Sequence, residues 1–158
     1  MAKDSQKKLT SANVHKELCS NKIWKCYFDG ALSKEGTVAG FIFISPEGNF
    51  LPFSFKLEFE STNNVAEYEA LILSLQTDKH MGIQSISVFG DSKLIIRQIK
   101  NFCQTKHPRL RSYRNEVWDI VENYFEAFNL QFIPREENRM ADSLAVSAIT
   151  FKPPINPN

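Results

Sequence analysis

The spacing of apolar residues changes once along this chain, and that change restricts the fold more than any other feature of the sequence. Between residues 24 and 59, apolar side chains alternate with polar ones or form a short continuous run, which predicts strands. From residue 65 onward, apolar residues recur at intervals of three and four, which predicts amphipathic helices between two further strands. Three consecutive strands followed by strands joined through helices indicate an α/β fold, with a five-stranded mixed sheet flanked by helices.

The individual elements are expected in the order βββαβααβα. The predicted strands cover residues 24–29, 38–45, 51–59, 86–90 and 130–133, and the predicted helices cover residues 65–81, 91–101, 108–128 and 141–148. The second strand is almost entirely apolar, so we expect it to be buried on both faces and to form a hairpin with the third. The first three strands are expected to be antiparallel and the later strands parallel to the first.

Length and composition indicate a single domain. The chain has 158 residues, of which 42% are hydrophobic and 23% charged, so it can bury an ordinary core. Residues 1–21 are expected to form a flexible arm, residues 22–150 the folded domain, and residues 151–158 a proline-rich tail. Both ends fit excision from a longer chain.

The sequence also predicts the compartment. No apolar run approaches the ~18 residues that a membrane span needs, and no signal peptide is evident, so we expect a soluble protein. Three cysteines without CxxC spacing disfavour a disulfide framework or a zinc site. A reducing, intracellular compartment is therefore expected.

Four acidic residues stand beside apolar positions, where a solvent-facing charge is not expected. Asp29 and Asp91 each follow a predicted strand, and they would emerge at the same sheet edge if those strands are parallel neighbours. Glu67 and Asp142 lie beside the buried faces of their helices. Converging carboxylates repel one another unless hard cations neutralise them, and Mg²⁺ prefers oxygen ligands of this kind.

Each of these residues also has a purely structural interpretation. Glu67 fits a capping box that begins at Asn64, and Asp91 fits the N-cap of the helix that follows it. Asp142 would complement a helix dipole, and Asp29 would begin a turn. These interpretations stay open for each residue alone, but they do not explain why all four occur together.

Four motifs carry a resemblance to a known family. They are YFDGA at 27–31, TNNVAEYEAL at 62–71, FGDS at 89–92 and IPREENRMADSLA at 133–145. Together they resemble the RNase H domain of plant gypsy-type LTR retrotransposon polyproteins, a group often called archaeal-like. The resemblance extends over about residues 24–148 in the family's order and spacing, and it implies an RNase H-like fold.

The resemblance implies a metal-dependent nuclease. It gives catalytic roles to Asp29 as ligand of both of two metal ions, to Glu67 and Asp91 at one ion, and to Asp142 at the other. Mg²⁺ is the expected ion, with Mn²⁺ as an alternative. The implied reaction is endonucleolytic hydrolysis of the RNA strand of RNA/DNA hybrids, giving 5′-phosphate and 3′-hydroxyl ends. The implied partners are the hybrid and a reverse transcriptase domain of the same polyprotein, with no membrane and a monomeric isolated domain.

Several polar and basic residues are candidates for contact with nucleic acid. Arg135 stands in the loop where many cellular RNases H carry a histidine; we hypothesise that it contacts a phosphate and assists turnover, the alternative being a solvated arginine. Residues 92–115 hold seven Lys or Arg and no acid, which favours a phosphate-tracking surface over a solvated face. The candidate nucleic-acid-binding residues are Gly30, Ala31, Asn63, Asn64, Ser92, Lys93, Arg97, Lys106, Arg109, Arg111 and Asn138.

A non-catalytic connection or hybrid-binding module of the same fold is the alternative function. Loss of catalysis would first erase the metal ligands, and all four acidic residues are present, which favours the nuclease. The sequence does not separate an element-encoded enzyme from a host-recruited one, nor the cytoplasm from a virus-like particle or the nucleus.

Overall fold

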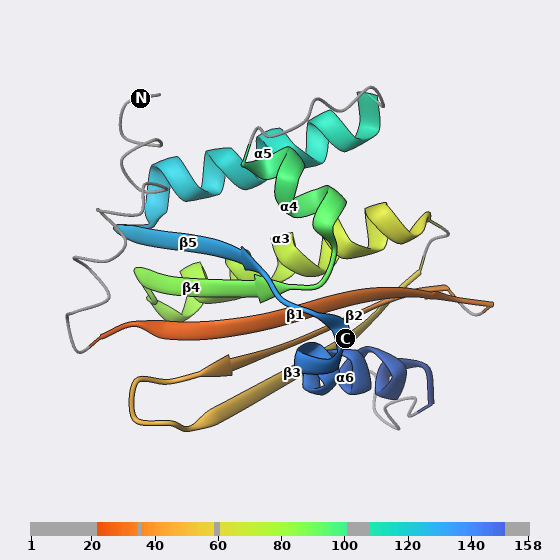
Figure 1. The fold of residues 1–158 in the computed structure, drawn as a ribbon, viewed down its shortest axis with the longest axis horizontal. Coiled ribbons are helices and arrows are strands. Elements are labelled where there is room, and N and C mark those ends of the chain that lie inside the picture. The colour runs from red at the N-terminus through yellow and green to blue at the C-terminus, as the bar shows by residue number, and fades with distance from the viewer. Residues whose placement is uncertain (1–21, 35, 59–60, 101–107, 151–158) are drawn as a thin grey trace.

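The computed structural model describes residues 22–34, 36–58, 61–100 and 108–150, which form a five-stranded sheet with helices on both faces (Figure 1). The strands are β1 (Trp24–Ser33), β2 (Gly36–Ile44), β3 (Phe50–Leu57), β4 (Ser85–Gly90) and β5 (Ala127–Phe132). The helices are α3 (Asn63–Met81), α4 (Lys93–Ile99), α5 (Pro108–Tyr124), the short 3-10 helix η1 (Arg135–Asn138) and α6 (Arg139–Thr150). The predicted arm at 1–21 and the predicted tail at 151–158 lie outside the described residues.

The sheet has the strand order β3-β2-β1-β4-β5. β2 is antiparallel to both β1 and β3, whereas β4 is parallel to β1 and to β5. The predicted element order and the mixed five-stranded sheet are therefore confirmed. β2 is buried at every position except its two ends, as its apolar sequence predicts.

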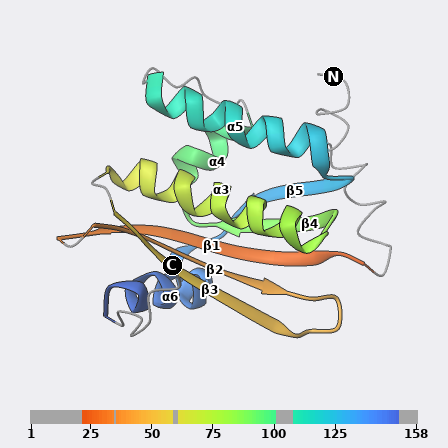
Figure 2. The same ribbon diagram turned by 180° about the vertical axis from the view of Figure 1, so that it is seen from behind.

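The two faces of the sheet are covered unequally. α3, α4 and α5 lie over one face and α6 over the other, and the view from behind agrees (Figures 1 and 2). The main core lies beneath the three helices, where Phe28 and Phe41 from the sheet meet Leu71 and Val121 from the helices. A smaller cluster on the α6 face contains Val38 and Ala145. None of the helices in the described part of the chain is both long and apolar enough to cross a membrane.

Several predicted element boundaries are wrong, and the largest differences are at the end of β1, at the end of α5 and at the start of β5, which is Ala127 and not Leu130. β1 does not end at Asp29 but continues to Ser33, because beyond the end of β4 it keeps its antiparallel pairing with β2. The helix that begins at Pro108 ends at Tyr124 rather than continuing to residue 128. Phe128 has helical spacing from Tyr124, but it pairs with Ile86 in the sheet, so the hydrogen bonds of the strand override the helical pattern.

Candidate metal centre

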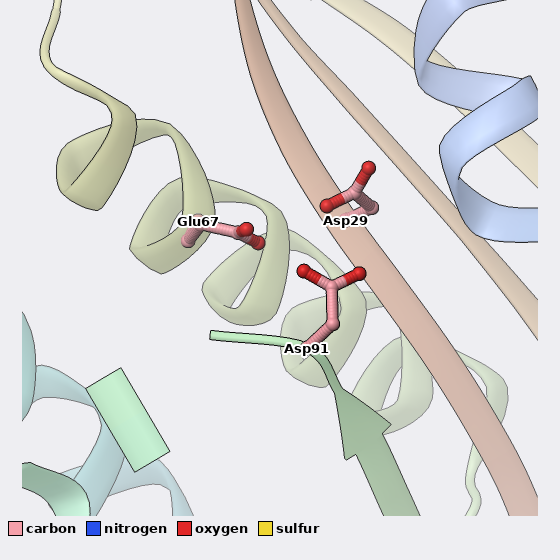
Figure 3. Close-up of side chains that lie close together, drawn as sticks. All are labelled: Asp29, Glu67 and Asp91. Atoms are coloured by element: carbon pink, nitrogen blue, oxygen red, sulfur yellow. The ribbon is translucent and has the colours of Figure 1, made fainter. Parts of the chain in front are cut away.

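Three carboxylates from distant parts of the chain meet at the edge of the sheet. Asp29 lies in β1, Glu67 in α3 and Asp91 directly after β4, and one oxygen of each lies within 4.8 Å of the others (Figure 3). The register explains the meeting of the two aspartates. Tyr27 pairs with Phe89 across the parallel strands, and the aspartates lie two residues further along their chains. Neighbouring parallel strands thus deliver both side chains to one edge.

Gly30 brings the third carboxylate to this edge. A Cβ atom on Gly30 would lie 2.1 Å from the carbonyl oxygen of Ala66, so only glycine permits this approach of α3 to β1. The backbone N–H of Gly30 donates a hydrogen bond to Glu67 Oε1 over 3.1 Å. Glu67, which is 9% exposed, is therefore held against the strand that carries Asp29.

Asp142 reaches the same place from the opposite face of the sheet. It lies in the first turn of α6 and is half-buried. α6 packs closely on β2 at Gly40, where a Cβ atom would lie 2.5 Å from Ala145 N and 2.6 Å from Ala141 O. Hydrogen bonding with Asp142 and the charge of Asp142 both help to raise the pKa of Asp29, so the two side chains lie close together. Asp142 is not part of the cluster of three, but it adjoins Asp29.

The crowding of the carboxylates changes their protonation. Burial raises the pKa of Asp29 from 3.8 to about 7, with further contributions from the charge of Asp91 and from Asp142. Burial, followed by the charges of Asp29 and Asp91, also raises the pKa of Glu67 well above its usual range. Asp29 Oδ2 is buried and has no hydrogen-bond partner among the described residues. An oxygen-only cluster with an unpaired buried carboxylate oxygen fits a hard divalent cation, which would compensate the repulsion.

The structure excludes helix capping for two of these acids. The N-cap of α3 is Thr62, whose side chain accepts a hydrogen bond from Val65 N over 3.2 Å, so the predicted capping box at Asn64 is wrong. The N-cap of α4 is Ser92 rather than Asp91. The turn interpretation of Asp29 is also wrong, because the residue lies within β1. The helix-dipole interpretation of Asp142 agrees with its place in the first turn of α6.

The candidate nucleic-acid-binding residues fall into different environments. Gly30 is buried, and Ala31 packs against the small cluster under α6. The exposed or half-buried candidates on the helices are Asn63, Asn64, Ser92, Lys93, Arg97, Arg111 and Arg135. Lys106 lies outside the described residues, as does the side chain of Arg109.

Asn138 has a place that the sequence did not indicate. It is 1% exposed, and its amide contacts Asp91 and the backbone of β1 instead of facing solvent. It stands among charged residues in a segment that is typical of an exposed loop, so composition gave no signal of burial. Only the contact across 47 residues shows its connection to the carboxylates.

The sheet order, the helices on both faces and the acidic cluster together define an RNase H-like domain. Residues 27–148 match the family model described as "Reverse transcriptase-like", and the chain belongs to this family. It is 33% identical over 125 residues to Ribonuclease HI of Halobacterium salinarum, a match that covers 78% of this chain and 62% of that protein. The chain thus spans about three fifths of the length of this curated relative.

Solved structures give the same fold. The crystal structure of RNase H1 from Halobacterium salinarum superposes with a TM-score of 0.76 at 30% identity, covering 81% of this chain and 98% of that one. LC11-RNase H1 in complex with an RNA/DNA hybrid superposes with a TM-score of 0.73 at 31% identity, covering 80% and 96%. The predicted RNase H fold is confirmed.

Proposed function

We propose that this chain is a ribonuclease H that hydrolyses the RNA strand of RNA/DNA hybrids endonucleolytically. The observation that carries the proposal is the convergence of Asp29, Glu67 and Asp91 within 4.8 Å, at the edge of a sheet with the RNase H strand order. Its support from relatives is a Ribonuclease HI at 33% identity and an RNase H1 solved with an RNA/DNA hybrid at 31% identity.

Asp29, Glu67, Asp91 and Asp142 would hold two divalent cations, with Mg²⁺ as the resident ion. Such ions, when bound, supply an activated water and stabilise charge on the leaving oxygen of a phosphodiester. Asp29 is suited to a shared position, because both Asp91 and Asp142 influence the pKa of its carboxyl group. Glu67, fixed by Gly30, contributes from the helix. The products would carry 5′-phosphate and 3′-hydroxyl ends.

The exposed polar and basic side chains near this edge would bind the hybrid. Asn63 and Asn64 are the first two residues of α3, about one turn before Glu67, and Lys93 and Arg97 extend the surface along α4. Arg135, exposed at the start of η1, would contact a phosphate. These residues would provide positive charge and hydrogen bonds to the sugar–phosphate backbone of the hybrid. Contacts of this kind allow a protein to bind a duplex independently of its sequence.

The cellular role that fits this activity is reverse transcription of a retroelement. In that role the domain would act beside a reverse transcriptase domain of the same polyprotein and remain monomeric when isolated. The setting would be intracellular, in the cytoplasm, a virus-like particle or the nucleus. The match to a reverse transcriptase-like family model supports this role.

Cleavage of an end-labelled RNA/DNA hybrid in Mg²⁺ tests the proposal. The wild-type chain should cut only the RNA strand, leave RNA/RNA and DNA/DNA duplexes intact, and lose activity in a chelator. Asp91→Asn should reduce the rate by at least ~10³-fold, since it removes one charge from the cluster. Asp119→Asn, a neutralisation of an exposed acid on α5, is the matched control and should cleave normally. A folded wild-type chain that binds the hybrid without cutting it in Mg²⁺ or Mn²⁺ would support a non-catalytic module instead.

A further inference from the structure

The side-chain amide of Asn138 connects two segments that are far apart in the sequence. Asn138 ends η1 and is 1% exposed. Its Nδ2 donates one hydrogen bond to the carbonyl oxygen of Phe28 over 2.9 Å and another to Asp91 Oδ2 over 2.8 Å. The two bonds span 110 and 47 residues. One amide group therefore ties the backbone of β1 to the carboxylate that follows β4.

Two oxygen acceptors determine how the amide is oriented. A reversed amide would point Oδ1 at the Phe28 carbonyl and at the Asp91 carboxylate, and neither can donate when Asp91 is ionised. The orientation observed uses both hydrogens of Nδ2 and leaves Oδ1 buried, with no hydrogen-bond partner among the described residues. A buried unpaired oxygen lowers stability. The side chain is therefore better matched to holding two acceptors than to stabilising the fold alone.

The amide also lies where the carboxylate-bearing segments converge. Phe28 directly precedes Asp29 in β1, and α6, which carries Asp142, begins at the residue after Asn138. Movement of Asn138 would therefore displace three of the four acidic residues, which are Asp29, Asp91 and Asp142.

We propose that Asn138 is a positioning residue that fixes the Asp91 carboxylate for cation binding. Asp91 is half-buried, so its carboxylate could turn toward solvent, away from the oxygens of Asp29 and Glu67, if nothing restrained it. A hydrogen bond from a buried amide to a charged oxygen is strong and directional, and it holds Oδ2 so that the other oxygen keeps one direction. Groups that orient metal-binding carboxylates in this way govern metal affinity without touching the metal.

A merely structural role would have different consequences. If Asn138 only fastened η1 to β1 through the Phe28 carbonyl, its loss would lower the free energy of unfolding and leave the metal affinity of the folded protein unchanged. Metal affinity and stability must therefore be measured separately. Ser74→Ala is a suitable control, since it removes a buried hydrogen bond, Ser74 Oγ to Leu71 O, further along α3 from the carboxylates.

The test is calorimetric titration of Mg²⁺ and Mn²⁺ into the nucleic-acid-free chain, with urea unfolding in a chelator alongside. Asn138→Ala should weaken metal binding by ~10-fold or more, whereas Ser74→Ala should bind metal as the wild type does at a comparable loss of stability. Asn138→Ser, which keeps one donor, should lie between wild type and Asn138→Ala. It also provides the measurement if Asn138→Ala does not fold.

The proposal rests on the proposed function for its metal site, and the experiment separates the two. If folded Asn138→Ala and Asn138→Ser bind metal as tightly as the wild type does, the positioning role is overturned and the proposed nuclease function is unaffected. Weakened metal binding in the variants of a wild-type chain that does not cleave hybrids would support the positioning role and overturn the nuclease. A wild-type chain that binds neither ion would overturn both.

Discussion

The backbone N–H of Gly30 donates a hydrogen bond to Glu67 Oε1 over 3.1 Å, and this contact joins the strand and the helix that carry two of the three clustered carboxylates. The same glycine lies against the backbone of α3 at Ala66. The absence of a side chain and the presence of a donor at one residue therefore set the distance between β1 and α3. The geometry of the cluster depends on backbone packing as much as on the acidic residues.

Gly30→Ala should be strongly destabilising for this reason. Its Cβ atom would lie 2.1 Å from Ala66 O and 2.7 Å from Glu67 N, which are backbone atoms that cannot move aside independently. We expect a loss of at least ~3 kcal/mol in the free energy of unfolding, at the upper end for overpacked sites. Gly48→Ala is the control, because nothing lies within 4 Å of its added Cβ and only its φ of +93° is unfavourable, at a cost of ~1–2 kcal/mol. Urea unfolding of both variants measures the difference, and an equal loss would contradict the steric argument.

The metal-free protein should lose stability as the pH rises from about 4 to about 7. The pKa of Asp29 is raised from 3.8 to about 7, chiefly by burial, so the folded chain keeps a proton that the unfolded chain releases in this interval. The contribution of this proton to the free energy of unfolding is fully present below pH 3.8 and is lost once the pH exceeds about 7. Glu67, whose pKa burial also raises, acts in the same direction.

Unfolding by urea in a chelator at several pH values between 4 and 8 measures this loss. Asp29→Asn should reduce the slope of the unfolding free energy against pH, and Mg²⁺ should stabilise the wild type more at pH 8 than at pH 5, because protons and the cation compete for the same oxygens. A slope that Asp29→Asn leaves unchanged would show that the cluster is not its source.

Most of the fold could be predicted because it depends on local patterns. The alternation over β1 and β3 and the apolar run of β2 are direct consequences of which faces are buried. The end of α5 could not be predicted, because Phe128 satisfies the helical spacing and only its pairing with Ile86 in a distant strand excludes it from the helix. Boundaries that depend on partners far along the chain carry no local signal.

The candidate site shows the same limit. Asp29 and Asp91 could be placed together, because β1 and β4 were expected to be parallel neighbours, although Asp29 lies within β1 and only Asp91 follows the end of its strand. The buried position of Asn138 could not, because η1 reads as a charged, solvated segment and its amide meets Phe28 only across 110 residues. Residues that support a site through long-range hydrogen bonds are therefore the ones that sequence patterns miss.

Asp78→Asn should stabilise the protein at neutral pH. Asp78 is 0% exposed, and neither carboxylate oxygen has a hydrogen-bond partner among the described residues. Burial raises its pKa from 3.8 to about 9, so the folded chain keeps the carboxyl protonated at pH 7 while the unfolded chain ionises it. Between pH 3.8 and about 9, stability falls with rising pH.

An asparagine at this position has a similar shape and does not ionise. It therefore removes the loss of stability that arises because the unfolded chain ionises Asp78 and the folded chain does not. We expect a gain on the order of 2–4 kcal/mol at pH 7 and little difference at pH 4. Urea unfolding at both values measures the gain, and hybrid cleavage by the variant provides a check that the site is intact. The same difference at both pH values would contradict ionisation as the cause.

Hybrid binding should depend on salt through the exposed arginines of α4 and α5. Arg97 and Arg111 are both exposed in a segment of the sequence that contains no acid. If each contacts a phosphate, then Arg97→Gln and Arg111→Gln should each lower the slope of log affinity against log salt by about 1, because fewer counterions are released on binding. The measurement is fluorescence anisotropy with a labelled hybrid in an Asp91→Asn background, in which cleavage is suppressed. Lys79→Gln is the charge-matched control, since Lys79 is in the last turn of α3, about 24 Å along the helix from its first residue. Arginine variants with the same slope as Lys79→Gln would place the hybrid elsewhere on the protein.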